Sequence, residues 1–363
     1  MAKNFHFPFT AIEGQEEMKK ALLLNAINPS IGGVLIRGEK GTAKSTTVRS
    51  LTDILPKMEV MDGCIFSCDP NGNMCDECLS KNKPYKTTFK EMKVVTLPIG
   101  STEDRVIGTI DIEKAIKEGI KSLDKGILAD ANRNILYLDE VNLLDDHIVD
   151  ILLDAAAMGW NTIEREGINI RHPSKFILVG TMNPEEGELR PQILDRFGLM
   201  VNVDGLMDVK KRVNVIKKVE EFNLNPKIIL EEYSKEQNLL REQIGNARKI
   251  LPTVKIENDL LEFISQICIE MNIPTNRADI TVARTAKTIA ALNQRDYVII
   301  DDIKEACELA LPHRMRRKPF DPPTLNNEKL EQFFDDFENE NNEDKNQDEN
   351  ENNENNSEED SKN

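Results

Sequence analysis

The chain has 363 residues, enough for two domains, and a formal net charge of −17. Residues 326–363 hold 15 acidic residues and three lysines, a net charge of −12, which leaves only −5 on the rest. A nearly neutral body lacks the basic face of a nucleic-acid binder, so we expect no nucleic-acid partner. No segment approaches the roughly 20 apolar residues of a membrane span, and residues 1–10 do not resemble a secretion signal. We therefore expect a cytoplasmic protein without a membrane partner.

The N-terminal part of the chain predicts a phosphate-binding loop. Residues 15–28 have helical periodicity, and residues 31–37 form a short apolar run typical of a buried strand. The loop follows and consists of Gly38, Glu39, Lys40, Gly41, Thr42, Ala43, Lys44, Ser45 and Thr46. Glycines let backbone N–H groups approach phosphate oxygens, the lysine places positive charge at the β- and γ-phosphates, and a serine hydroxyl ligates Mg²⁺. The stretch therefore predicts a site for ATP and Mg²⁺, with Ala43 at a place where the usual pattern has glycine.

An irregular segment at residues 56–90 holds four of the six cysteines. Their spacing is Cys64-x3-Cys68-x6-Cys75-x2-Cys78. Four thiolates at this spacing suit a tetrahedral Zn²⁺ ion or an iron–sulfur cluster. The alternatives are a regulatory disulfide and thiols that stay reduced. In an intracellular chain, clustered cysteines favour a metal site over a disulfide framework.

Four further apolar runs predict the rest of a parallel sheet. They cover residues 93–98, 134–140, 176–180 and 199–203. Helical patterns separate most of these runs, so the chain belongs to the α/β class with a five-stranded sheet. The run at 134–140 ends in Asp139 and Glu140. In phosphate-loop ATPases an acidic residue at such a strand end holds Mg²⁺, here together with Ser45, and a neighbouring carboxylate orients the attacking water. We assign these roles to Asp139 and Glu140.

Two polar residues complete the predicted catalytic site. Asn183 follows the strand expected at 176–180 and is placed to hydrogen-bond the γ-phosphate or the attacking water. Arg196 lies between the fourth and fifth strands, on the far side of the domain from the nucleotide of its own chain. An arginine there would stabilise transition-state charge in a neighbouring subunit. That role predicts a ring of subunits.

The strand patterns end near residue 205, which predicts three regions. Residues 1–205 form a nucleotide-binding α/β domain, with a β-hairpin expected at 162–170. Residues 206–320 form an all-helical lid domain, with helices expected at 208–222, 226–248, 258–271, 278–293 and 301–311. Residues 321–363 form a Pro-rich hinge and a disordered acidic tail, because a charged, low-complexity sequence buries too little apolar area to offset chain entropy.

The chain resembles the ATPase subunit I of magnesium chelatase, an AAA+ protein, over about residues 5–320. The stretches that carry the resemblance are GEKGTAKST, ILYLDEVNLL, GTMNPEEGELRPQILDRFG and LPHRMRRKPFD. The resemblance implies an AAA+ phosphate-loop fold and a ring, usually a hexamer, whose ATP hydrolysis drives Mg²⁺ into protoporphyrin IX in a ligase reaction that forms nitrogen–metal bonds. It also implies a second AAA+ subunit with an integrin-like domain and a large tetrapyrrole-binding subunit. Segments near 100–125 and 162–172 match insertions of this clade.

The resemblance carries the same roles to individual residues. Those already assigned keep their places in the family pattern, namely Lys44, Ser45, Thr46, Asp139, Glu140, Asn183 and Arg196. It adds Arg284, in the helix expected at 278–293, as the second sensor that would contact the γ-phosphate from the lid. Arg277 is the weaker candidate for that role because it precedes this helix.

Four other functions share part of the pattern. A cobalt chelatase would insert Co²⁺ into a corrin ring with the same motor. A MoxR-like chaperone shares the loop and the insertions, but the NPEEGELRPQILDRFG and HRMRRKPFD stretches favour the chelatase. A DNA-remodelling ATPase would need salt-sensitive DNA binding, which the nearly neutral body disfavours. A nucleotide-binding scaffold without turnover is disfavoured by Glu140.

Overall fold

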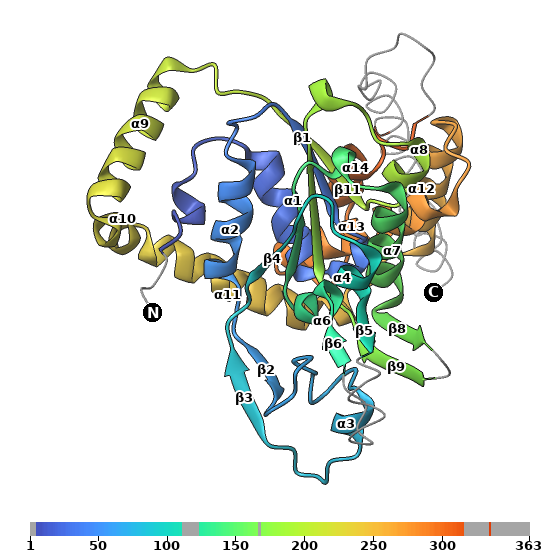
Figure 1. The fold of residues 1–363 in the computed structure, drawn as a ribbon. Helices are drawn as coiled ribbons and strands as arrows, with labels where there is room; N and C mark the ends of the chain where they lie inside the picture. Colours follow the sequence, from blue (N-terminus) through green and yellow to red (C-terminus); the bar gives the residue numbers. More distant parts are fainter. Residues whose placement is uncertain (1–4, 111–122, 166–167, 316–333, 335–363) are drawn as a thin grey trace, which may run out of the picture.

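The computed structural model describes residues 5–110, 123–165, 168–315 and 334 (Figure 1). A five-stranded sheet lies at its centre, in the order β11-β1-β10-β7-β4, and all of its pairings are parallel. The strands are Val34–Gly38 (β1), Val94–Leu97 (β4), Ile135–Leu138 (β7), Ile177–Met182 (β10) and Leu199–Val203 (β11). The predicted α/β fold with a five-stranded parallel sheet is confirmed.

Both faces of the sheet are buried, which explains why its strands are continuous apolar runs. Successive side chains of a strand point to opposite faces, so Val34 and Ile36 join one apolar cluster and Leu35 joins another. The first face packs against α1 (Glu16–Ile27) and α2 (Lys44–Ile54). The second is covered by α4 (Glu103–Ile107), α6 (Ile127–Ala131) and α7 (Asp146–Met158). The sheet is therefore the middle layer between two sets of helices.

Three antiparallel strand pairs extend from the sheet. They are β2 (Met58–Met61) with β3 (Thr87–Lys90), β5 (Gly108–Ile110) with β6 (Leu123–Lys125), and β8 (Trp160–Arg165) with β9 (Ile168–Pro173). The predicted hairpin at 162–170 is confirmed. The prediction that 56–90 is irregular is wrong at both ends, because β2 and β3 have only four residues each, too few to show a clear alternation of apolar and polar residues. Of the predicted insertion at 100–125, residues 111–122 lie outside the described residues.

The described elements after β11 are helical. They are α9 (Val209–Leu224), α10 (Pro226–Glu232), α11 (Ser234–Ile250), α12 (Asn258–Glu270), α13 (Asn276–Leu292) and α14 (Ile300–Ala310). The helix predicted at 226–248 is two helices, because the chain leaves helical geometry at Tyr233 without a glycine or proline to signal it. Among the described helices, none is long and apolar enough to cross a bilayer. The predicted helical region is confirmed, whereas its boundaries at 206 and 320 stay predictions.

The helical region packs on the face of the sheet that α1 covers. Helices α11 and α13 contact α1, and α13 also contacts the 3-10 turn Pro29–Ile31 that precedes β1. Polar contacts join the same surfaces: Arg248 donates to the Ala26 carbonyl at 2.7 Å, and Asn28 donates to the Thr288 hydroxyl at 3.0 Å. α1 is therefore buried between the sheet and the helices.

One residue of the predicted acidic tail is packed in the structure. Phe334 is buried, and its ring stands edge-on to that of Phe263 on α12, with centroids 5.2 Å apart. Other residues of the predicted hinge and tail, 321–333 and 335–363, lie outside the described residues, and their disorder stays a prediction. The prediction is wrong at Phe334, because an aromatic ring gains enough from burial to pack on the lid.

A buried arginine joins the end of the helical region to the start of β11. Arg314 donates to the carbonyls of Phe197 at 2.6 Å and Gly198 at 2.9 Å, and its Nε lies 3.3 Å from Asp195. Burial lowers the pKa of Arg314 to about 10, and Asp195 opposes this effect. Gly198 has no room for a side chain, because a Cβ there would lie 2.2 Å from the Ile31 carbonyl oxygen. These contacts fix how the helices meet the sheet.

We expect Arg314→Ala to lower the free energy of unfolding by about 3–5 kcal/mol, because Asp195 and two backbone carbonyls lose a buried cationic partner. Urea unfolding followed by circular dichroism measures the change. Arg277→Ala is the matched control, since Arg277 pairs with the same carboxylate at 2.9 Å but is half exposed. Its loss should stay below about 1 kcal/mol. Equal losses in the two variants would contradict the assignment.

Candidate nucleotide-binding site

The loop between β1 and α2 has the backbone geometry of a phosphate-binding loop. Gly38 lies so close to β11 that a Cβ would be 2.3 Å from the Val203 carbonyl oxygen. Gly41 has a φ of +84° and Ala43 a φ of +61°, both in the left-handed region that favours glycine. The methyl group of Ala43 is thus accepted at a glycine position. The loop leads directly into the first turn of α2, where backbone N–H groups have no partner within the helix.

This loop forms one wall of a cavity of about 400 Å³. The other wall comes from the ends of β7 and β10, which meet the loop because the carboxyl ends of parallel strands lie at one edge of a sheet. The lining residues are Lys40, Gly41, Thr42, Ala43, Lys44, Ser45, Thr46, Tyr137, Asp139, Glu140, Thr181, Met182 and Asn183. The structure therefore brings together the predicted loop from Lys40 onward with Asp139, Glu140 and Asn183. Gly38 and Glu39 precede the cavity.

A larger cavity of about 690 Å³ lies elsewhere. It is lined by the C-terminal end of α2, by residues 91–94 at the amino end of β4, and by residues of α11 such as Arg241. None of the phosphate-loop residues lines it. Its place at the opposite edge of the sheet makes it unsuitable as the phosphate site.

The two lysines of the loop make different contacts. Lys44 Nζ donates to the carbonyls of Gly38 and Glu39, both at 2.6 Å. Partial burial lowers the pKa of Lys44, and the nearby carboxylates of Asp139 and Glu140 act in the opposite direction. Its ammonium thus lies between the loop and the acidic wall, where phosphate oxygens would be bound.

Lys40 connects the loop to the carboxylates on the other wall. Its Nζ lies 2.6 Å from Glu186 and 3.1 Å from Glu140. Hydrogen bonds to these two carboxylates raise the pKa of Lys40 to about 12. The sequence predicts only nucleotide binding for Lys40 and no role for Glu186, because a contact between turns so far apart in sequence leaves no local pattern.

Asp139 is held in place by two hydroxyl groups. Tyr137 and Thr181 both donate to its Oδ1 at 2.8 Å. Burial raises the pKa of Tyr137, so its phenol keeps the proton that it donates. Neither donor is predicted from the sequence. The available signal was a lone tyrosine in an aliphatic strand, two residues before Asp139 and so on the same face.

Glu140 and Asn183 stand at the ends of neighbouring strands. Glu140 has a left-handed backbone, with a φ of +50°, and its N–H donates to the Thr181 hydroxyl at 3.3 Å. Asn183 is buried, and its Oδ1 accepts the N–H of Glu185 at 3.3 Å. Both side chains line the cavity. Their predicted roles toward water and the γ-phosphate stay predictions that this placement permits.

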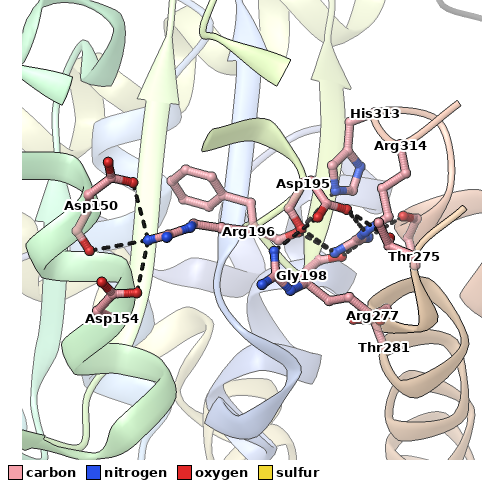
Figure 2. Close-up of polar contacts among 12 residues, drawn as sticks. Asp150, Asp154, Asp195, Arg196, Gly198, Thr275, Arg277, Thr281, His313 and Arg314 are labelled. Carbon is pink, nitrogen blue, oxygen red and sulfur yellow. Dashed lines mark hydrogen bonds and ion pairs between the residues drawn. The ribbon is translucent and has the colours of Figure 1, made fainter. Parts of the chain in front are cut away.

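Arg196 lies outside the cavity and contacts α7 (Figure 2). Its Nη1 is 3.1 Å from a carboxylate oxygen of Asp150 and 2.9 Å from one of Asp154. The side chain points away from the Asp195–Arg314 contacts. Because Arg196 does not line the cavity of its own chain, its predicted role would have to be played at the site of another subunit.

The two lid arginines also lie outside the cavity. Arg284 donates to the Ser30 carbonyl at 2.7 Å, and Ser30 precedes β1, at the end of that strand opposite the loop. Arg277 pairs with Asp195. Helix α13 packs on the 3-10 turn before β1, so within one chain neither arginine reaches the phosphate loop. The assignment of Arg284 as a sensor stays a prediction.

The arrangement fits a nucleotide with its metal ion. Phosphate oxygens would be held by the loop N–H groups and Lys44, and the hydroxyl of Ser45 and the carboxylate of Asp139 are oxygen ligands of the kind that Mg²⁺ prefers. Glu140 lies beside this metal position. The cavity therefore has the groups for ATP binding and for activation of a water molecule.

The chain is similar to known proteins of one family. The family model for magnesium chelatase, subunit ChlI, matches residues 8–192, and that for the AAA lid domain matches residues 261–333. The magnesium-chelatase subunit ChlI homolog of Methanocaldococcus jannaschii is 71% identical over 346 residues, 95% of each chain. The magnesium-chelatase subunit ChlI of Nostoc sp. is 51% identical over 325 residues, 88% of this chain and 87% of that relative.

Two solved structures are also similar. One, from a cryo-EM study of the complex between subunits BchI and BchD of magnesium chelatase, has a TM-score of 0.53 and 45% identity, and covers 86% of this chain and 97% of that one. A putative ATPase from Cytophaga hutchinsonii has a TM-score of 0.59 at 19% identity over 89% of each chain, and shows the fold alone. The phosphate loop, the strand order and the matched relatives agree, and the chain belongs to the magnesium chelatase subunit ChlI family of AAA+ ATPases.

Proposed function

We propose that this chain is the ATP-hydrolysing motor of a chelatase that inserts Mg²⁺ into protoporphyrin IX in chlorophyll-type tetrapyrrole synthesis. The observation that carries the hydrolytic part is the joint placement of Lys44, Asp139 and Glu140 around one cavity. The choice of Mg²⁺ as the inserted metal rests on the similarity to relatives that are named magnesium-chelatase subunits. A separate large subunit would bind the tetrapyrrole. This chain, located in the cytoplasm, would hydrolyse ATP to drive the insertion and would not bind the porphyrin itself.

Each residue of the cavity has a distinct part in hydrolysis. Bound Mg²⁺ would neutralise charge on the β- and γ-phosphate oxygens. Ser45 and Asp139 would hold that ion, and the hydroxyls of Tyr137 and Thr181 fix the orientation of Asp139. Glu140 orients the attacking water and accepts its proton. Asn183 donates to the γ-phosphate.

The site requires a neighbouring subunit. Arg196 is about two thirds buried against α7 and outside its own cavity, so a subunit packed against this surface would receive its positive charge. We propose a homo-oligomeric ring, a hexamer by family resemblance. A related BchI chain has been studied in complex with BchD, which supports a second AAA+ subunit as partner.

Glu140→Gln should bind ATP normally and lower kcat for hydrolysis by about 10²–10⁴-fold, because the amide cannot accept a proton from water. Nucleotide binding by calorimetry and phosphate release measure the two effects. Glu262→Gln, an exposed substitution of the same kind on α12, is the control and should hydrolyse ATP at the wild-type rate. Wild-type turnover by Glu140→Gln would exclude Glu140 as the base.

Arg196→Ala should bind ATP and hydrolyse it about 10³-fold more slowly, if the arginine acts in a neighbouring subunit. Mixing it with Lys44→Ala subunits should restore part of the activity, because an intact cavity then meets an intact arginine. Arg190→Ala, which removes an exposed arginine paired with Asp146, serves as the control. Full hydrolysis by isolated Arg196→Ala monomers would contradict the ring.

The identity of the inserted metal can be tested by reconstitution. We expect the chain, mixed with the second AAA+ subunit and the tetrapyrrole-binding subunit encoded in its own genome, to form magnesium protoporphyrin in an ATP-dependent reaction detected by fluorescence. Lys44→Ala should abolish product, since the loop loses its phosphate-binding charge. Insertion of Co²⁺ into a corrin substrate, with no magnesium product, would instead identify a cobalt chelatase.

A further inference from the structure

Four cysteine thiols converge between β2 and β3. The Sγ atoms of Cys64, Cys68, Cys75 and Cys78 all lie within 4.8 Å of one another. All four residues are buried, with 0–5% of their surface exposed. The ATPase site uses none of them. A cluster of this kind, closed to solvent and built from four thiols, needs its own explanation.

The spacing of the sulfur atoms fits a single tetrahedral ion. Four thiolates about 2.3 Å from one Zn²⁺ ion lie about 3.8 Å from each other. The separations of the thiols, all within 4.8 Å, are compatible with that distance. In an iron–sulfur cluster the four thiolates are divided among two or four iron atoms, so at least some pairs must stand further apart than around one ion. The geometry therefore favours one ion over a cluster.

The backbone around the cluster is arranged in two turns, one for each pair of cysteines. In the first turn, the N–H of Cys64 donates to the Met61 carbonyl at 3.2 Å, and the N–H of Met61 donates to the Cys68 carbonyl at 3.0 Å. In the second, Cys75 immediately precedes α3 (Asp76–Leu79), which contains Cys78. The N–H of Cys75 donates to Cys68 Sγ at 3.2 Å, a contact that stabilises a thiolate. Two turns thus present four sulfurs to one point.

The segment around the cluster has few buried apolar side chains. Besides the cysteines, its buried apolar cluster consists of Met61, Phe66 and Ala129, with Met74 and Tyr85 partly buried. So few apolar side chains cannot offset the conformational entropy of residues 62–86. Small folded segments of this kind are held by a metal or by disulfides. The cluster is in the right place to supply that stabilisation.

The same segment is attached to the ATPase core. Phe66, between the first two cysteines, stacks on His172 of β9, with ring centroids 4.6 Å apart and planes 9° apart. Its carbonyl accepts a hydrogen bond from Asn132 at 2.7 Å. Asn132 precedes β7, so the contact lies at the end of that strand opposite Asp139. Figure 1 shows β2, β3 and α3 extending from the sheet on this side.

We propose that Cys64, Cys68, Cys75 and Cys78 bind one Zn²⁺ ion, which holds residues 62–86 in place against the amino end of β7 and against β9. Four protein ligands leave no open coordination position, so the site is structural. Soft thiolates do not suit Mg²⁺, which prefers oxygen ligands, so the site is separate from the metal that a chelatase would insert.

The first test is the metal content of the purified full-length chain. We expect about one zinc per chain by mass spectrometry and a loss of nearly all of it in Cys75→Ser. Cys268→Ser is the matched control, because Cys268 is also a buried free cysteine but lies on α12, and it should keep its zinc. Iron with inorganic sulfide, iron alone, or two disulfides detected by the loss of four hydrogens in the intact mass would each overturn the proposal.

The second test uses the wild-type chain, so that it does not depend on the folding of a variant. After removal of zinc with a thiol reagent and a chelator and then reduction, Co²⁺ alone should give thiolate-to-cobalt charge-transfer bands and the strong visible bands of a tetrahedral ion. Added Zn²⁺ should remove these bands. A reduced chain that takes up neither ion would overturn the proposal.

The structural role has its own readout. Removing the metal should make residues 62–86 at least about tenfold more sensitive to limited proteolysis, because the metal contributes directly to folding of the segment. ATP binding should persist, since the cavity lies at the other end of β7. Unchanged protease resistance after complete removal of zinc would exclude a structural role.

Discussion

The parallel register of β1, β7 and β10 is the constraint on which the nucleotide site depends. Gly180 of β10 is paired with both Leu35 of β1 and Leu138 of β7, so the carboxyl ends of the three strands lie at the same edge of the sheet. The residues that follow them then meet around one cavity although they are far apart in sequence. The same register places Thr181 beside Asp139, where its hydroxyl and that of Tyr137 orient the carboxylate. A change of register by one residue would turn these side chains to the other face of the sheet.

The position of the helical region determines where the predicted arginines Arg277 and Arg284 lie relative to the phosphate loop. Helices α11 and α13 pack on α1 and on the turn before β1, and Arg314 fixes this arrangement through the carbonyls ahead of β11. Within one chain the helices therefore leave Arg284 and Arg277 away from the phosphate loop. Arg196 is likewise held on α7. The three predicted arginines thus lie outside the cavity of their own chain, which supports the proposal that adjacent subunits complete the site.

The three antiparallel strand pairs have a different physical character from the sheet. Their strands are short and partly polar, and they cannot be stable as isolated hairpins in water. The β8–β9 pair contacts α7, α4 and β5, whereas the β2–β3 segment relies on Phe66, Asn132 and the cysteines. The zinc proposal therefore concerns how residues 62–86 are held against the ATPase core. The ATPase proposal does not depend on it.

Sequence alone determined the parts of this protein that depend on neighbouring residues in the chain. Glycine and lysine spacing predicted the phosphate loop, and apolar runs predicted five buried strands. Asp139 and Glu140 were predicted to lie at the nucleotide site because they stand at the end of one of these strands. Only the tertiary structure revealed Tyr137 and Thr181 as partners of Asp139, the pairing of Lys40 with Glu186, and the packing of Phe334 on Phe263. It also placed Arg284 at the wrong end of β1 for its own loop. These features arise from contacts between distant segments, which leave no periodicity or spacing in the sequence.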